Sequence, residues 1–161
     1  MTALDDRDLD LDDRPTLLDE IPRVRVLVAE DDAALRDLVV STLERDGYAV
    51  DQAVSGAGAL ASLESLEVAA WPAEAVDLLV VDMCMPGLNG LDVLRRLRAA
   101  HWTTPAILMT AFAAPEVIAE ACRLGALVLS KPFPLDMLTR TARALIEHVG
   151  EQTSAHGFKL S

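Results

Sequence analysis

The sequence predicts an α/β protein in which a doubly wound sheet of five parallel strands carries helices on both faces. Three observations support this fold class. Short apolar runs rich in Val, Leu and Ile alternate along the chain with longer segments of helical periodicity, which is the pattern of βαβ units. Several of the short runs are apolar at every position, as expected for strands buried on both faces of a parallel sheet. Each run also ends abruptly in polar residues, as strands do at the edge where open α/β sheets bind ligands.

The first half of the chain contains two predicted strands and two predicted helices. The first strand runs from Val24 to Val28, and a helix follows from Ala33 to about Asp46, with Gly47 just past its end. One face of this helix is apolar and consists of Leu35, Leu38, Val39 and Leu43. Tyr48 to Val54 alternates as a second strand, and the second helix covers about Gly56 to Val68.

The second half continues the alternation of strands and helices. Val76 to Val81 is a continuous apolar third strand, and a helix begins near Leu91 and stops before His101. The next elements are a strand at Pro105 to Met109, a helix at Pro115 to Leu124 and a strand at Ala126 to Leu129. The last helix has an apolar stripe formed by Leu135, Leu138, Ala142, Leu145, Ile146 and Val149. Five units with right-handed crossovers favour the flavodoxin-like strand order 2-1-3-4-5.

These elements define one domain, which we predict to span residues 23–149. Residues 1–22 form an acidic N-terminal arm that we expect to be disordered, because its Asp, Arg and Leu residues follow no sustained period. A short docking helix from Thr16 to Ile21 is the alternative for this arm. Residues 150–161 are polar and are predicted to form a flexible tail.

Composition and charge argue against several classes of protein. The net charge is −12, and half of it comes from the arm, where eight acidic residues face two arginines. Direct nucleic-acid binding is not expected, because phosphate contacts require clustered Lys and Arg. No apolar run approaches the roughly 20 residues of a membrane span, and the acidic N-terminus lacks the features of a secretory signal. Cys84 and Cys122 give neither a disulfide framework nor zinc-site spacing, which favours a cytoplasmic protein.

Four of the predicted strand ends carry chemically useful side chains. Glu30 and Asp31 come after the first strand, Asp82 after the third, Thr110 after the fourth and Lys131 after the fifth. Because the carboxyl ends of parallel strands meet at one edge of a sheet, we expect three carboxylates, a hydroxyl and an ammonium group to converge. That set of groups is suited to a divalent metal and a phosphoryl group.

The four segments resemble the receiver (CheY-like) domain of bacterial two-component response regulators. The resemblance covers about Arg23 to Val149 and consists of Glu-Asp-Asp after strand one, Asp-x-x-x-Pro-Gly after strand three, Thr after strand four and Lys-Pro-Phe after strand five. It implies a single-domain response regulator that accepts a phosphoryl group on Asp82 from a sensor histidine kinase or a phosphotransfer protein. The domain would then switch a surface that binds a downstream protein target. It would be a phosphorelay signalling protein and not an enzyme, although it assists its own phosphorylation and slow dephosphorylation, and it could form a homodimer.

The resemblance also implies a Mg²⁺ site. Glu30, Asp31 and Asp82 would hold the ion together with the backbone carbonyl of Cys84, and Glu30 could act through a water molecule. The acids after the first strand could instead cap the following helix. Asp32 suffices for that role, and holding further like charges together is costly without a cation.

Lys131 and Thr110 complete the implied site. In the family the peptide bond between this lysine and the following proline, here Lys131 and Pro132, is cis. The ammonium group of Lys131 would pair with Asp82 and later with a phosphoryl oxygen. Thr110 would donate its hydroxyl to that oxygen, or it would merely satisfy a backbone group at the strand end. Many receivers have an aromatic residue three positions before the lysine, where this chain has Val128. We therefore expect the switch to act through movement of the loop and the fourth helix.

Two other functions fit parts of the pattern. A phosphohydrolase of the haloacid dehalogenase type would need a second Asp two residues after Asp82, where Cys84 stands. A receiver-like interaction module that never uses phosphorylation would not need every one of the chemical residues to be intact.

By the same resemblance, Cys84 and Phe112 flank the path of hydrolytic water. Because a thiol is a weak hydrogen-bond partner and a phenyl ring offers none, we expect slow self-dephosphorylation. The alternative is that Phe112 points away and packs on the fourth helix.

Overall fold

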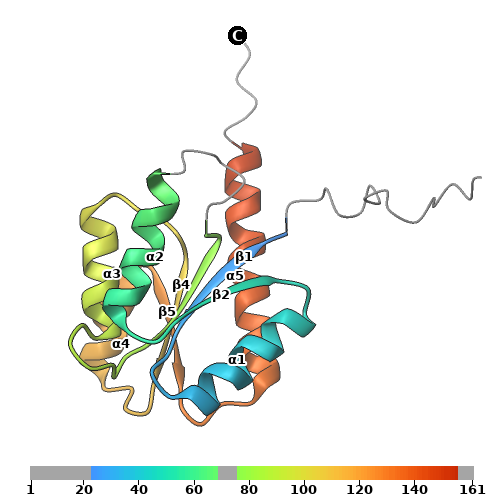
Figure 1. Cartoon of the computed structure of the whole chain (residues 1–161). Helices are drawn as coiled ribbons and strands as arrows, with labels where there is room; N and C mark the ends of the chain where they lie inside the picture. The colour runs from blue at the N-terminus through green and yellow to red at the C-terminus, as the bar shows by residue number, and fades with distance from the viewer. Residues whose placement is uncertain (1–22, 69–75, 156–161) are drawn as a thin grey trace, which may run out of the picture.

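The computed structural model describes residues 23–68 and 76–155. Within them, parallel strands form a five-stranded sheet with the order β2-β1-β3-β4-β5, between two layers of helices (Figure 1). The strands are β1 (Arg25–Ala29), β2 (Ala49–Ala53), β3 (Leu78–Asp82), β4 (Ala106–Thr110) and β5 (Ala126–Ser130). The helices are α1 (Ala33–Arg45), α2 (Gly56–Val68), α3 (Gly90–Ala99), α4 (Pro115–Arg123) and α5 (Leu135–Ala155). The predicted fold class and strand order are confirmed.

Each face of the sheet has its own aliphatic core, because consecutive strand residues point to opposite faces. Leu27 and Ala29 of β1 pack in the core under α2, α3 and α4, where Leu94 is fully buried. Val26 and Val28 pack in the core under α1 and α5. Figure 1 shows the same division, with α1 and α5 on one side of the sheet and α2, α3 and α4 on the other. Burial on both faces explains why the strands are apolar throughout.

Four strands extend one residue beyond their predicted ends. In β3, β4 and β5 the predicted strand stops before the first polar side chain, but strand pairing is made by the backbone and is indifferent to the side chain. Asp82 therefore pairs with Met109, and Thr110 pairs with Ser130. As a consequence, two of the predicted site residues stand on the sheet itself and not on a loop.

Helix α1 begins and ends as predicted, but its buried face differs. The side chain of Asp32 accepts a hydrogen bond from the Leu35 backbone N–H at 2.8 Å, and Gly47 past the other end has φ +98°. The assignment of Leu38 to the core is wrong, since 46% of it is exposed while Val40 is buried. The stripe that faces the sheet is thus rotated toward Val40.

Helix α5 is longer than predicted. It continues through Gly150 to Ala155, so the predicted start of a flexible tail at residue 150 is too early. A single glycine inside a helix costs only about 1 kcal/mol relative to alanine, which does not by itself end the helix. Residues 1–22, 69–75 and 156–161 lie outside the described residues, so the predictions for the N-terminal arm, including its alternative docking helix, fall there. Among the helices the structure does describe, none combines the length and apolar character needed to cross a membrane.

Candidate functional site

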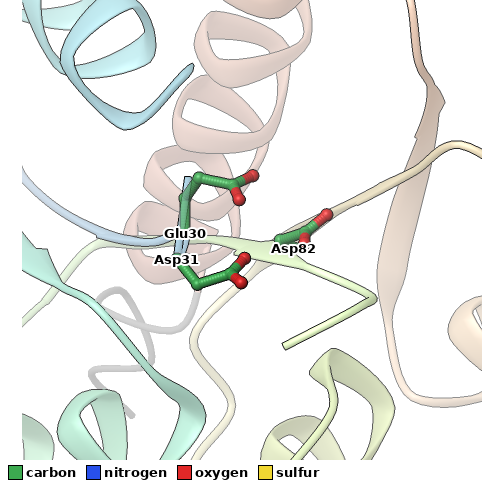
Figure 2. Close-up of side chains that lie close together, drawn as sticks. All are labelled: Glu30, Asp31 and Asp82. Atoms are coloured by element: carbon green, nitrogen blue, oxygen red, sulfur yellow. The ribbon is translucent and has the colours of Figure 1, made fainter. Parts of the chain in front are cut away.

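Three carboxylates converge at the carboxyl edge of the sheet, as the sequence predicts. Glu30 and Asp31 follow β1, and Asp82 is the last residue of the neighbouring strand β3. One oxygen from each side chain lies within 4.8 Å of the other two. Figure 2 shows the three side chains gathered at this end of the sheet. The spacing is short enough for a single cation to contact all three groups.

Glu30 is buried and already hydrogen-bonded through both carboxylate oxygens. Its Oε1 accepts the backbone N–H of Asp32 at 3.1 Å, and its Oε2 lies 3.0 Å from Lys131 Nζ. Only 1% of the residue is exposed. Burial raises the pKa of the Glu30 carboxyl, and the two hydrogen bonds only partly offset this. The nearby charge of Asp82 raises it further.

Lys131 connects the strands that carry the acidic residues. Its Nζ lies 2.7 Å from Asp82 Oδ1 as well as 3.0 Å from Glu30 Oε2, and its backbone N–H donates to the Thr110 carbonyl at 2.7 Å. The peptide bond to Pro132 is cis, as in the family the sequence resembles. Burial lowers the pKa of the ammonium group, but hydrogen bonds and charge attraction from Asp82 and Glu30 outweigh burial and raise it. Lys131 therefore remains a cation at neutral pH.

The donor set suits a magnesium ion. Three carboxylates face one ammonium group, so the ionised site carries uncompensated negative charge that a divalent cation would neutralise. Asp31 is exposed, and Asp82 uses one oxygen on Lys131. Both are free to offer an oxygen to a metal. The Glu30 oxygens are both engaged, which favours contact with a metal through water.

Asp82 is 3% exposed, and close packing fixes the backbone around it. The N–H of Met83 donates to the Met109 carbonyl at 2.7 Å. Gly90, the first residue of α3, lies against the strand end, and a Cβ there would be 2.6 Å from the Asp82 carbonyl oxygen. Only glycine allows this approach. Sequence reasoning missed Gly90, although the helix-capping residue Asn89 before it marks the start of α3.

The Thr110 hydroxyl satisfies a backbone group at the strand end, which is the alternative role predicted from the sequence. It accepts the backbone N–H of Phe112 at 3.1 Å and donates to the carbonyl of Phe112 at 3.2 Å. The residue is 1% exposed. In contrast, Phe112 is 78% exposed, so its ring is not packed on α4. A hydrogen bond from Thr110 to a phosphoryl group stays a prediction.

Arg36 is a second neighbour of the site that sequence reasoning missed. It is half-buried in the first turn of α1, and its guanidinium group donates to the Glu30 carbonyl at 2.9 Å and to Gln52 Oε1 at 3.3 Å. No sequence pattern marks the contact, because it depends on how α1 lies against β2. Cys84, two residues after Asp82, is a free and exposed thiol.

Comparison with known proteins identifies the family. The family model for the response regulator receiver domain matches residues 26–143. A probable transcriptional regulatory protein of Picosynechococcus is 38% identical over 125 residues, which cover 77% of this chain and 49% of that protein. Sporulation initiation phosphotransferase F of Bacillus subtilis is 31% identical over 113 residues, which cover 70% of this chain and 85% of that protein. This chain spans about half the length of the transcriptional regulators it matches.

Solved structures agree with this assignment. The receiver domain of the Francisella response regulator 1452 superposes with a TM-score of 0.68 at 28% identity, covering 78% of this chain and 98% of that one. The chemotaxis protein CheY4 of Vibrio cholerae gives a TM-score of 0.67 at 28% identity, covering 76% and 98%. The chain therefore belongs to the response regulator receiver domain family.

Proposed function

We propose that this receiver domain accepts a phosphoryl group on Asp82 from a sensor histidine kinase or a phosphotransfer protein. The contact that carries the proposal is the bridge from Lys131 Nζ to both Asp82 and Glu30, set beside a third convergent carboxylate. A cluster of this kind leaves negative charge poorly compensated in a buried place. That arrangement is costly for stability, and a divalent cation would relieve it. The cation and Lys131 would then together offset the negative charge of an incoming phosphoryl group.

The proposed metal ligands are Asp31, Asp82 and the backbone carbonyl of Cys84, with Glu30 acting through water. When bound, Mg²⁺ would neutralise charge on the phosphoryl oxygens. An Asp82 carboxylate oxygen attacks phosphorus in line, the P–N bond of the phosphohistidine breaks, and its electron pair returns to the imidazole nitrogen. The ammonium of Lys131 exchanges its contact with Asp82 for one with a phosphoryl oxygen. Positioning and charge neutralisation thus supply the catalysis, and no separate acid or base is required.

Phosphorylation would shift the conformation of a protein-binding surface. Thr110 would release Phe112 and donate to the phosphoryl group, which frees the loop before α4. Val128 is half-buried and has no ring to move inward, so the loop and α4 would transmit the change. The adjoining surface carries exposed apolar side chains from α4, β5 and α5, namely Ile118, Leu127 and Met137. Their apolar character favours a downstream protein or a second copy of the chain as the binding partner over nucleic acid.

The proposed setting is the cytoplasm. Cys84 and Cys122 are both free and exposed, which fits a reducing compartment. The relatives named transcriptional regulators extend well beyond the matched region. We propose for this acidic chain that the receiver itself contacts proteins and not DNA.

The test is phosphorylation by a small donor, acetyl phosphate, in the presence of Mg²⁺. The expected result is a mass gain of one phosphoryl group in the wild type and none in Asp82→Asn. Asp77→Asn is the matched control, because Asp77 is an exposed carboxylate just before the opposite end of β3. Phosphorylation of Asp82→Asn would refute the assignment. A wild type that accepts no phosphoryl group from acetyl phosphate or from kinases would favour the phosphorylation-independent module.

A further inference from the structure

We propose that Arg36 is a positioning residue for the Mg²⁺ site, acting on the turn that carries Glu30 and Asp31. The inference rests on the proposed function, because it concerns the metal ligands of that site. In the described part of the chain, the Arg36 side chain donates to the Glu30 backbone carbonyl and to Gln52, and not to the three carboxylate groups. Its effect would pass through the backbone.

The backbone of Glu30 is held from both sides at the point where the chain leaves β1. Its N–H donates to the Ala53 carbonyl of β2 at 3.1 Å. Its carbonyl oxygen accepts Nη1 of Arg36 at 2.9 Å, and Nε of the same guanidinium group donates to Gln52 Oε1 at 3.3 Å. Arg36 therefore ties the turn after β1 to the neighbouring strand β2.

This tie determines where Asp31 can reach. The Glu30 carbonyl belongs to the same planar peptide group as the Asp31 nitrogen, so fixing that oxygen fixes the direction in which Asp31 leaves the turn. Asp31 is exposed, and surrounding side chains do not enclose it. The position of its carboxylate therefore depends mainly on the backbone. Without the tie, the turn could rotate and carry Asp31 away from Asp82.

The geometry uses a property particular to arginine. A guanidinium group is a rigid planar fork that can donate in two directions at once, whereas a lysine ammonium is a point charge on a flexible stem. The start of α1 holds the fork in place, since the backbone N–H of Arg36 donates to the Asp32 carbonyl at 2.9 Å. Asp32 in turn caps the helix. The helix start, the acidic turn and β2 are thus joined through one side chain.

Positioning and simple electrostatics predict opposite results when Arg36 is removed. A guanidinium cation near a metal site repels Mg²⁺, so an effect of charge alone would make Arg36→Ala bind the ion more tightly. Loss of positioning would make it bind more weakly. The sign of the change in Mg²⁺ affinity therefore separates the two roles.

The experiment measures Mg²⁺ affinity of the full chain by isothermal titration calorimetry. We expect Arg36→Ala to bind about 10-fold more weakly, the usual scale for residues that orient metal ligands. Arg36→Lys should recover part of the loss, and Gln52→Ala should show a smaller loss. Asp31→Asn is the reference for removal of a ligand. The matched control is Arg45→Ala, which removes the same charge about 13 Å further along α1.

Phosphorylation by acetyl phosphate gives a second readout. In Arg36→Ala the Mg²⁺ concentration for half-maximal rate should rise. Unchanged or tighter Mg²⁺ binding in Arg36→Ala overturns the inference and leaves the phosphoacceptor assignment intact. A wild type that binds no Mg²⁺ overturns the metal site and this inference together. If Arg36→Ala fails to fold, Arg36→Lys and Gln52→Ala decide: weaker Mg²⁺ binding than in wild type supports the inference, and unchanged or tighter binding overturns it.

Discussion

Two ionic clusters in this molecule have the same arrangement, but the pKa of the glutamate shifts upward in one and downward in the other. In the buried cluster, Lys131 lies between two carboxylates, 2.7 Å from Asp82 and 3.0 Å from Glu30. In the surface cluster, Glu120 of α4 lies between two guanidinium groups, 2.7 Å from Arg123 and 3.0 Å from Arg95 of α3. Each cluster places one charge between two opposite charges at matching distances.

The outcomes differ because of burial. Hydrogen bonds from Arg123 and Arg95 lower the pKa of Glu120 to about 2. Burial raises the pKa of Glu30, even though Lys131 and a backbone N–H both donate to it. Ion-pair distances alone therefore do not reveal whether a cluster stabilises the fold. The surface cluster is satisfied as it stands, whereas the buried one is an arrangement that a function explains better than stability does.

The strongest way to test this comparison is to remove one cation from each cluster. Lys131→Met should lower the rate of phosphorylation by acetyl phosphate roughly 100-fold or more, because a preorganised charge is lost from a site shielded from water. Arg95→Met removes one of the two cations of the surface cluster and should leave the rate within about twofold of wild type. Thermal unfolding of both variants checks that they are folded. Equal rate losses in the two variants would remove the functional distinction between the clusters.

The same variants should differ in Mg²⁺ binding. Lys131→Met leaves the carboxylates without their cation and should bind Mg²⁺ more tightly than wild type, even though it is phosphorylated more slowly. Arg95→Met should bind Mg²⁺ as wild type does. Slower transfer together with tighter metal binding would be hard to explain by misfolding.

The sequence was sufficient to predict which strand ends meet and much less informative about the contacts made there. Convergence of Glu30, Asp31 and Asp82 follows from the polar residues at the strand ends and from the strand order that the alternation of strands and helices favours. Both can be recognised from local patterns in the sequence. The double contact of Arg36 depends on how a helix lies against a strand, and no local pattern records that. The Thr110 hydroxyl had two chemically reasonable partners, and only side-chain torsions decide between them. The ends of β3, β4 and β5 were misplaced by one residue because polarity was taken as the limit of backbone pairing.

The lifetime of the phosphorylated state depends on how water reaches the buried cluster. Cys84 and Phe112 are both exposed, and the family resemblance implies that they flank the path by which a hydrolytic water would reach the buried cluster. Neither side chain can hold a hydrolytic water in line with phosphorus, so the aspartyl phosphate should decay slowly. Cys84→Asn and Phe112→Glu should each speed decay by about 10-fold, below the roughly 100-fold or more that a fully positioned acid–base group contributes.

Decay is measured by following the loss of phosphorylated protein after the donor is removed. Cys122→Asn is the control, because it introduces the same amide at the other exposed cysteine. If decay is as slow in Cys84→Asn and Phe112→Glu as in wild type, these positions do not set the lifetime of the phosphorylated state.

The smallest expected effects are on stability, and there the two clusters should differ in sign. The pKa of Glu120 is about 2 in the folded protein against 4.5 for the free side chain. Its stabilising contribution is therefore present above pH 4.5 and is lost as the pH falls toward about 2. The pKa of Glu30 is raised above 4.5, so the stabilising form is the neutral one. That contribution is present below pH 4.5 and is lost as the pH rises through the raised pKa.

Glutamine mimics a neutral glutamate, so the same substitution tests both carboxyl groups. At about pH 7 and without Mg²⁺, Glu120→Gln should lower the free energy of unfolding and Glu30→Gln should raise it. At about pH 4 the benefit of Glu30→Gln should shrink, because Glu30 in the wild type is by then largely neutral.

Added Mg²⁺ should also reduce the advantage of Glu30→Gln by stabilising the wild type, and it should leave the effect of Glu120→Gln unchanged. Urea unfolding at both pH values measures these differences. A loss of stability in Glu30→Gln at neutral pH would mean that its hydrogen bonds outweigh the cost of burying its charge, and the contrast between the two clusters would fail.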